Sequence, residues 1–176
     1  LLGDYDLALT DLNKAIELLP TDPAALIARG DLHRAQQIWT EAIADYTQAI
    51  TLDPTAASVY GSRGRAYESL RDYATALIDY TKAIELAPTE VNNFINRANV
   101  YSALGDFANA ITDFSAALAL DETLTVAYVG RGLARLEMQD LAAALADLEI
   151  AVELDPKSAA VYNSRARIYE AQEEWA

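Results

Sequence analysis

Small and bulky apolar residues recur along the chain with the spacing i, i+4, i+7, which places them on one face of an α-helix. Each stripe is about one helix long, and short breaks, such as residues 104–106, separate one stripe from the next. The pattern itself repeats, because Pro20, Pro54 and Pro88 lie 34 residues apart and Pro156 lies two such periods further on. Two helical stripes in every period predict an all-α solenoid built from antiparallel helix pairs.

Aligning the repeats on this period arranges their apolar positions in columns. The bulky column of the second helix, which lies between two alanine columns, holds Leu12, Tyr46, Tyr80, Phe114 and Leu148. The small column of the first helix holds Gly30, Gly64, Ala98, Gly132 and Ala166. Small residues are expected where two helices approach closely, with a bulky side chain filling the remaining space. The columns keep their phase over the whole chain, which a chance amphipathic pattern would not sustain.

These columns resemble the signature of the tetratricopeptide repeat family, which pairs a bulky residue, Gly or Ala and an aromatic on the first helix with Ala, aromatic and Ala on the second. The resemblance covers essentially the whole chain and implies a right-handed superhelical solenoid whose first helices line a concave groove. In the family that groove holds extended peptides or partner helices. The predicted array, residues 1–176, consists of a partial repeat that is mostly a second helix, four complete repeats and a partial repeat that is mostly a first helix: 1–22, 23–56, 57–90, 91–124, 125–158 and 159–176.

We expect the chain to be a fragment, because it begins after the first helix of its opening repeat and stops where a second helix should start. An uncapped end of a repeat array leaves half an interface in water. Either flanking sequence continues the array, or another copy of the chain supplies the contact. For a crystal of this fragment we expect the second arrangement, an end-to-end self-association in which the last first helix meets the opening helix of a neighbour.

Two further columns are ionic and have no exceptions. They hold arginines at Arg29, Arg63, Arg97, Arg131 and Arg165, and aspartates at Asp11, Asp45, Asp79, Asp113 and Asp147. In each complete repeat the arginine precedes the aspartate by 16 residues, and the chain reverses midway, so the two lie at one height on facing helices. The spacing therefore predicts the ion pairs Arg29–Asp45, Arg63–Asp79, Arg97–Asp113 and Arg131–Asp147. Many members of the family look apolar or aromatic at these positions, so the columns mark a subtype.

The arginine column could also act as a ladder for an anionic ligand, because guanidinium groups bind carboxylate and phosphate well. An arginine with an aspartate at its own level is already satisfied, however, so we favour the structural role. Such pairs set the register of the helices more than they add stability, because desolvation offsets much of the attraction.

The composition limits the possible partners. The formal charge of −14 would repel nucleic acid and anionic membranes, so we expect neither as a partner. A neutral or basic protein or peptide is favoured, although the acidity could serve only to keep an extended surface in solution. The chain has no apolar run of membrane-spanning length, and the absence of cysteine excludes disulfides and thiolate metal sites.

Signatures of catalysis are missing. The sequence contains no Gly-rich phosphate loop, nucleophile elbow or zinc-ligand spacing. His33 is the only histidine and stands in a column that is otherwise mostly tyrosine, so we interpret it as a packed ring. We predict no catalytic residue, cofactor or metal, and no enzyme activity in this chain. Arrays of the family are often attached to catalytic domains, so a regulatory array of a larger enzyme remains an alternative.

The resemblance implies that function resides on the first-helix positions that packing leaves free. Two such stretches stand out, three amides around an isoleucine and then an apolar stripe: Asn92, Ile95, Asn96 and Asn99, and Val126, Val129, Leu133 and Leu136. Amides can hold a peptide main chain while an apolar face accepts a hydrophobic anchor, so we predict the peptide site here. Alternatively, a further repeat, an appended domain or a second copy covers the stripe. Arg135 replaces an aromatic residue nearby, so this repeat could be looser or require an acidic partner.

Recognition of a chaperone tail through its carboxylates is not expected. The subset of the family that does this uses lysines on first helices, whereas the lysines here, Lys14, Lys82 and Lys157, fall on second helices or a connecting turn. Two hypotheses remain. The chain is either a non-catalytic module that binds a peptide or helix of a partner protein in its groove, or an architectural element for assembly of arrays or oligomers.

Overall fold

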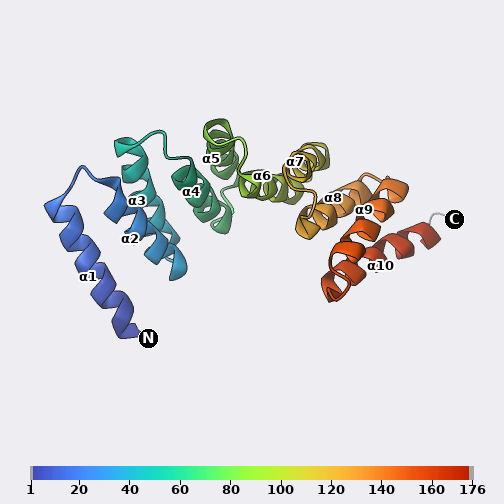
Figure 1. Ribbon diagram of the computed structural model, residues 1–176, viewed down its shortest axis with the longest axis horizontal. Coiled ribbons are helices and arrows are strands. Elements are labelled where there is room, and N and C mark those ends of the chain that lie inside the picture. The colour runs from blue at the N-terminus through green and yellow to red at the C-terminus, as the bar shows by residue number, and fades with distance from the viewer. Residues whose placement is uncertain (1, 175–176) are drawn as a thin grey trace. The chain divides into compact units, whose positions relative to one another are not determined.

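The computed structural model describes residues 2–174, with side-chain surroundings for residues 5–172. Within residues 2–174 the chain forms ten α-helices and no strand, which confirms the predicted all-α class (Figure 1). The helices are α1 (Leu2–Leu18), α2 (Pro23–Ala35), α3 (Trp39–Leu52), α4 (Ala57–Ser69), α5 (Tyr73–Leu86), α6 (Val91–Ala103), α7 (Phe107–Leu120), α8 (Thr125–Glu137), α9 (Leu141–Leu154) and α10 (Ala159–Glu174).

Contacts group the helices into two compact units. The N-terminal unit comprises residues 1–88 with α1 to α5, and the C-terminal unit comprises residues 89–176 with α6 to α10. In the N-terminal unit α2 packs on α3 and α4 on α5, and in the C-terminal unit α6 packs on α7 and α8 on α9. Each of these helix pairs falls inside one of the repeats expected from the sequence. A single array over residues 1–176 remains a prediction.

The alanine and bulky columns of the second helices form the core of both units. The alanines at the first of these columns are fully buried, at 0% exposure: Ala42, Ala76, Ala110 and Ala144. The bulky residues one turn further along are at most 1% exposed: Tyr46, Tyr80, Phe114 and Leu148. Burial of a large apolar side chain contributes about 1.5–3 kcal/mol, so these columns supply much of the driving force for packing.

In the N-terminal unit the ring of each second helix lies against a glycine of its own first helix. A Cβ atom added to Gly30 would lie 2.7 Å from Cε1 of Tyr46, and one added to Gly64 would lie 3.0 Å from Cε1 of Tyr80. Real Cβ atoms essentially never lie as close as the first of these distances, and at the second the tyrosine ring would have to shift by a few tenths of an ångström. Glycine is therefore needed here because only a residue without a Cβ lets the ring reach the helix backbone.

The repeat at residues 91–124 solves the same packing problem differently. Ala98 stands in the glycine column, and its buried Cβ occupies the space that the tyrosine rings use in the N-terminal unit. The tip of the Phe114 ring points instead at Gly130 on α8, where any Cβ would collide with Cζ of the ring. The ring thus approaches the first helix of the following repeat. The first helix that follows Tyr46 has Ser62, and not a glycine, at the position equivalent to Gly130.

The turn within each helix pair ends the first helix with a residue of positive φ. These residues are Gln37, Arg71, Gly105 and Gln139, with φ from 61° to 78°. In three of the four turns the next residue is an aspartate whose side chain caps the second helix: Asp72, Asp106 and Asp140. The aspartate N–H also donates to a carbonyl five residues earlier, as in a Schellman motif.

Two turns between successive repeats are held by an aspartate and a threonine. The hydroxyl and the N–H of Thr55 donate to Oδ1 of Asp53, and those of Thr123 donate to Asp121 in the same way. These bonds lower the pKa of both carboxyl groups. They stabilise the turns above the usual aspartate pKa, and the effect is lost as the pH falls through the lowered values.

The arginine and aspartate columns form an ion pair inside each complete repeat. The pairs join facing helices at 2.5 to 2.7 Å: Arg29–Asp45, Arg63–Asp79, Arg97–Asp113 and Arg131–Asp147. The aspartates are only 1% to 4% exposed. Nη1 of Arg29, Arg63 and Arg131 also donates to the preceding second helix, at Asn13, Thr47 and Ser115. Each of these arginines therefore fixes the height of three helices at once.

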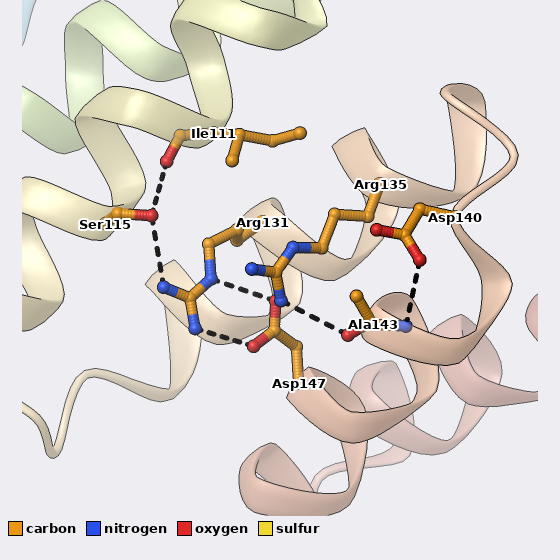
Figure 2. A network of polar contacts seen from close by, with 7 residues as sticks. All are labelled: Ile111, Ser115, Arg131, Arg135, Asp140, Ala143 and Asp147. Atoms are coloured by element: carbon orange, nitrogen blue, oxygen red, sulfur yellow. Dashed lines mark hydrogen bonds and ion pairs between the residues drawn. The ribbon is translucent and has the colours of Figure 1, made fainter.

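The residue one turn after the arginine reinforces the pair in one of two ways. Nδ1 of His33 lies 3.0 Å from Oδ2 of Asp45, and Nη1 of Arg135 donates to Asp147 at 2.7 Å and to the Ala143 carbonyl (Figure 2). The tyrosines in this column instead stack on the paired arginine, with Tyr67 and Tyr101 each 6.0 Å from the guanidinium carbon.

These contacts correct the expectation that Arg135 needs an acidic partner. Figure 2 shows Arg131 and Arg135 converging on Asp147 from α8. The carboxylate that Arg135 requires is already present on α9 of its own repeat. His33 contacts a carboxylate as well, in addition to filling the place of a packed ring.

Replacing Asp79 with Ala leaves the Arg63 guanidinium without its buried carboxylate. We expect the free energy of unfolding to fall by about 3 kcal/mol, as for other buried pairs that lose one member. The double variant Arg63→Met and Asp79→Leu removes both charges and should cost less. Urea unfolding followed by circular dichroism measures both, and a double variant as unstable as the single one would contradict the role in register.

Replacing Gly130 with Ala places a Cβ inside the Phe114 ring. We expect a loss of about 1–3 kcal/mol of stability through overpacking, although alanine favours the helix. Adding Ala98→Gly removes the Cβ at position 98 and gives the Phe114 ring the kind of space that Tyr80 has beside Gly64. The double variant should therefore recover part of the lost stability. Thermal unfolding tests this coupling. A Gly130→Ala variant as stable as the parent chain would show that the ring does not need the gap.

Candidate functional site

The first-helix residues that the sequence singles out all lie in the C-terminal unit, on α6 and α8, but they differ in exposure. Asn92, Asn99 and Val126 are exposed, and Asn96 is partly buried. Ile95 is only 8% exposed and belongs to the core cluster that contains Phe114. Ile95 therefore stabilises the helix pair and offers little surface to a ligand.

The apolar stripe on α8 is also divided between packing and solvent. Val129 and Leu136 pack against a cluster that includes Leu148 and Ile168, so α9 and α10 cover much of these two side chains. Leu133 is partly buried in a different direction, toward α6. The second apolar face that the sequence indicates is therefore smaller than expected. Val126, at 56% exposure, is its one exposed member, and Leu133 is partly buried beside Asn99 and Ser102 of α6.

A pocket of about 230 Å³ lies between α6 and α8 and brings the two predicted stretches together. Its lining comes from the two first helices and from α7 between them: Asn99, Ser102, Phe107, Phe114, Gly130, Leu133, Ala134 and Glu137. Asn99 and Leu133 were predicted as ligand contacts from the sequence. Phe107, Phe114, Gly130 and Glu137 were not, because the period alone does not show where one repeat departs from the others.

The tyrosine hydroxyls in the N-terminal unit show what is different at Phe114. Oη of Tyr46 donates to Asp31 at 2.8 Å, and Oη of Tyr80 donates to Glu68 at 2.6 Å. Burial, together with the nearby carboxylate, raises the pKa of Tyr46 to about 12 and raises that of Tyr80 as well. Phe114 has no hydroxyl to make this bond.

In the C-terminal unit the two columns that supply these carboxylates hold uncharged residues. Asn99 stands in the column of Asp31, and Ser102 stands in the column of Glu68. Both side chains line the pocket instead of bonding to the ring. Two features of the sequence could have indicated this pocket. Phe114 lacks the hydroxyl of Tyr46 and Tyr80, and Gly130 is the only glycine in its column.

A second hollow, of about 470 Å³, lies on α4 and α5 of the N-terminal unit. Its charged lining residues are already paired with one another, Arg63 with Asp79 and Lys82 with Glu85. It therefore offers a ligand no charged group that lacks a partner.

Within residues 2–174, no group of three or more histidine, aspartate or glutamate side chains is placed to hold a metal ion. No helix in the same range has the length and apolar character needed to span a bilayer.

Comparison with known families finds repeat models along most of the chain. A model described as TPR repeat matches residues 30–71, and models described as tetratricopeptide repeat match residues 57–90, 92–124 and 129–176. The match over residues 57–90 coincides with one repeat predicted from the prolines. No curated protein sequence matches the chain.

Several solved structures share the fold. The crystal structure of MamA is 22% identical, with a TM-score of 0.84 over 88% of this chain and 91% of that one, and shows the fold alone. YrrB, a TPR protein with an unusual peptide-binding site, is 25% identical, with a TM-score of 0.79 over 92% of this chain and 84% of that one.

A third structure is more similar in sequence. The first TPR of Spaghetti (RPAP3), solved with the HSP90 peptide SRMEEVD, is 34% identical, with a TM-score of 0.64 over 66% of this chain and 93% of that one. The helix pairs, the models that match them and this repeat domain agree: the chain belongs to the tetratricopeptide repeat family.

Proposed function

We propose that the chain is a non-catalytic binding module that holds an extended segment of a partner protein along α6 and α8. The observation that carries the proposal is the pocket between these helices, which joins Asn99 and Leu133 above the Phe114 ring. A pocket of this size accepts one side chain, and flanking polar groups then hold the main chain of the segment.

The exposed amides of α6 fit the second of these tasks. Asn92 and Asn99 are exposed and lie two turns apart on one face of the helix. An asparagine side chain offers both a donor and an acceptor, so it can bond to the N–H and C=O groups of a bound segment. Val126 adds an exposed apolar contact on α8. Together these side chains provide polar contacts around an apolar anchor.

The similar structures and the charge support the same class of partner. Spaghetti (RPAP3) was solved with a peptide, and YrrB is described as having a peptide-binding site. The formal charge of −14 favours a neutral or basic segment over an acidic one. Tetratricopeptide repeats serve as protein-interaction modules, which also supports a role without catalysis.

A second candidate function is assembly, and the exposed face of α10 favours it. Tyr162 and Tyr169 are 41% and 45% exposed, and Arg165 stacks between them without an ion pair among the described residues. Asp11 on α1 is exposed and belongs to the column that pairs with arginine elsewhere. The opening helix of a second copy would therefore supply the carboxylate that Arg165 lacks.

Peptide capture tests the binding role directly. We expect the chain to retain members of a library of random seven-residue peptides, and Leu133→Ser to weaken the retained peptides about tenfold by removing one wall of the pocket. Leu120→Ser, an exposed change on α7, is the matched control and should leave affinity unchanged. Fluorescence anisotropy gives the affinities, and circular dichroism checks helicity. Equal affinity for the Leu133→Ser variant would rule out this pocket.

Sedimentation at increasing concentration separates assembly from recruitment. Assembly through the chain ends predicts a mass that rises with concentration, and Arg165→Glu should reduce it by placing like charges together. A monomer at all concentrations that still binds peptides would leave recruitment as the function.

A further inference from the structure

We propose that the pocket between α6 and α8 takes a basic side chain, arginine or lysine, from the bound segment. This inference rests on the proposed function, because it specifies the residue that the same pocket selects. Three features carry it: the single charge in the lining, the residue that fills the equivalent place beside Tyr46 in the N-terminal unit, and the aromatic floor.

The lining of the pocket contains one charged residue, Glu137. Asn99 and Ser102 add oxygen atoms that can accept hydrogen bonds, and no lysine or arginine lines the pocket. A ligand side chain with an apolar stem and several donors at its tip satisfies all three groups. An acidic side chain would be able to accept from the Asn99 amide and the Ser102 hydroxyl, but it would lie beside Glu137, whose like charge disfavours it.

The N-terminal unit has two equivalent places, and they differ: beside Tyr80 the place holds Glu68, whereas beside Tyr46 it holds an arginine. Two repeats before Phe114 stands Tyr46, and two repeats before Ser102 stands Arg34. Nη2 of Arg34 and Oη of Tyr46 both donate to Oδ1 of Asp31, at 3.4 and 2.8 Å. Nε of Arg34 is buried. The chain thus fills this place with its own guanidinium beside an aromatic ring and a carboxylate.

In the C-terminal unit the same place has lost its internal cation. Ser102 is too short to reach across the ring, and Leu133 replaces Arg65, the other nearby arginine column. The aromatic ring remains as Phe114, and the carboxylate is now supplied by Glu137 on α8. The pocket therefore keeps two of the three elements of the arrangement at Tyr46, and an outside arginine or lysine would restore the third.

The aromatic floor suits a cation as well. Phe107 and Phe114 both line the pocket, and a guanidinium or ammonium group is attracted to the face of such a ring. Arginines of this chain repeatedly adopt this arrangement, for example Arg131 over Tyr128 at 5.5 Å and Arg165 over Tyr162 at 5.3 Å.

One internal cation competes for Glu137. Nη2 of Arg167 on α10 lies 3.5 Å from Oε1 of Glu137, and the two side chains are 55% and 48% exposed. An exposed contact of this length contributes little, so a cation inside the pocket can displace it. We expect Arg167→Gln to tighten binding of a basic peptide rather than weaken it.

Peptides that differ at one position provide the first test. The probes are seven-residue peptides with random flanks and a central arginine, lysine, tyrosine, norleucine or glutamate. We expect arginine and lysine pools to bind at least about tenfold more tightly than the norleucine pool, and the advantage to shrink with added salt. Binding of all pools without this preference would overturn the inference and leave the proposed function standing. Preference for tyrosine would overturn it too, and no binding by any pool would overturn both.

Two variants test the groups involved. Glu137→Gln should reduce the preference for arginine over norleucine about three- to tenfold. Glu153→Gln removes the same charge at an exposed position on α9 and should leave the preference unchanged. Equal effects of the two variants would assign the preference to net charge and contradict the pocket.

A self-filling variant gives an independent readout. Ser102→Arg introduces the arginine that stands two repeats earlier, at Arg34, so it should weaken arginine peptides at least about tenfold, while Ser102→Ala changes their affinity less than about threefold. Circular dichroism confirms that both variants fold. Unchanged affinity in a folded Ser102→Arg variant would contradict the inference.

Discussion

The approach of a bulky side chain on each of α3, α5, α7 and α9 to the backbone of a first helix is the contact on which the rest of the structure depends. Where the first helix has glycine, as at Gly30 and Gly64, the ring of the same repeat reaches its backbone. Because a close-packed interior cannot absorb an extra methyl group, the position of the missing Cβ decides which first helix the ring approaches. For Phe114 the residue without a Cβ is Gly130 on α8, because position 98 on α6 is alanine, and the ring approaches α8.

The ion pairs act on the same helices in a different way. The ring sets how closely two helices approach, and the arginine sets their relative height, because Arg131 bonds to Asp147 on α9 and to Ser115 on α7. These aspartates are almost fully buried, so their pairing is a requirement of the fold and leaves the arginines unavailable as a ligand ladder. The surface that we propose for binding therefore lies on first-helix positions outside both columns.

Periodicity in the sequence predicted the regular part of the molecule well. The helix pairs and the pairing of each arginine with the aspartate 16 residues later follow from the repeat and from helix geometry alone. The candidate site was harder to predict, because it arises where one repeat differs. Leu136 and Ile95 look free on a helical projection, yet neighbouring helices cover them. Arg135 looked unpaired because its partner, Asp147, had been assigned to Arg131.

Family membership does not specify a ligand, and the repeat at residues 91–124, which differs from the others, is where we propose that one binds. Tyr46 and Tyr80 close the space beside their rings with a hydroxyl and a carboxylate, whereas Phe114, Asn99 and Ser102 leave it open. A structural repeat has no need of such an opening. The pocket shares an acidic group and an aromatic ring with the place around Tyr46, which the guanidinium of Arg34 fills. We infer the chemistry of a bound side chain from this likeness.

The most direct test of this account is an NMR titration of the methyl-labelled chain with an arginine-containing peptide. We expect the largest shift changes to fall on the methyl groups of Leu133 and Ala134, with nuclear Overhauser contacts from the arginine side chain to Leu133 and to the Phe114 ring. Shift changes confined to other surfaces, or contacts made by an apolar peptide residue instead of the arginine, would contradict it.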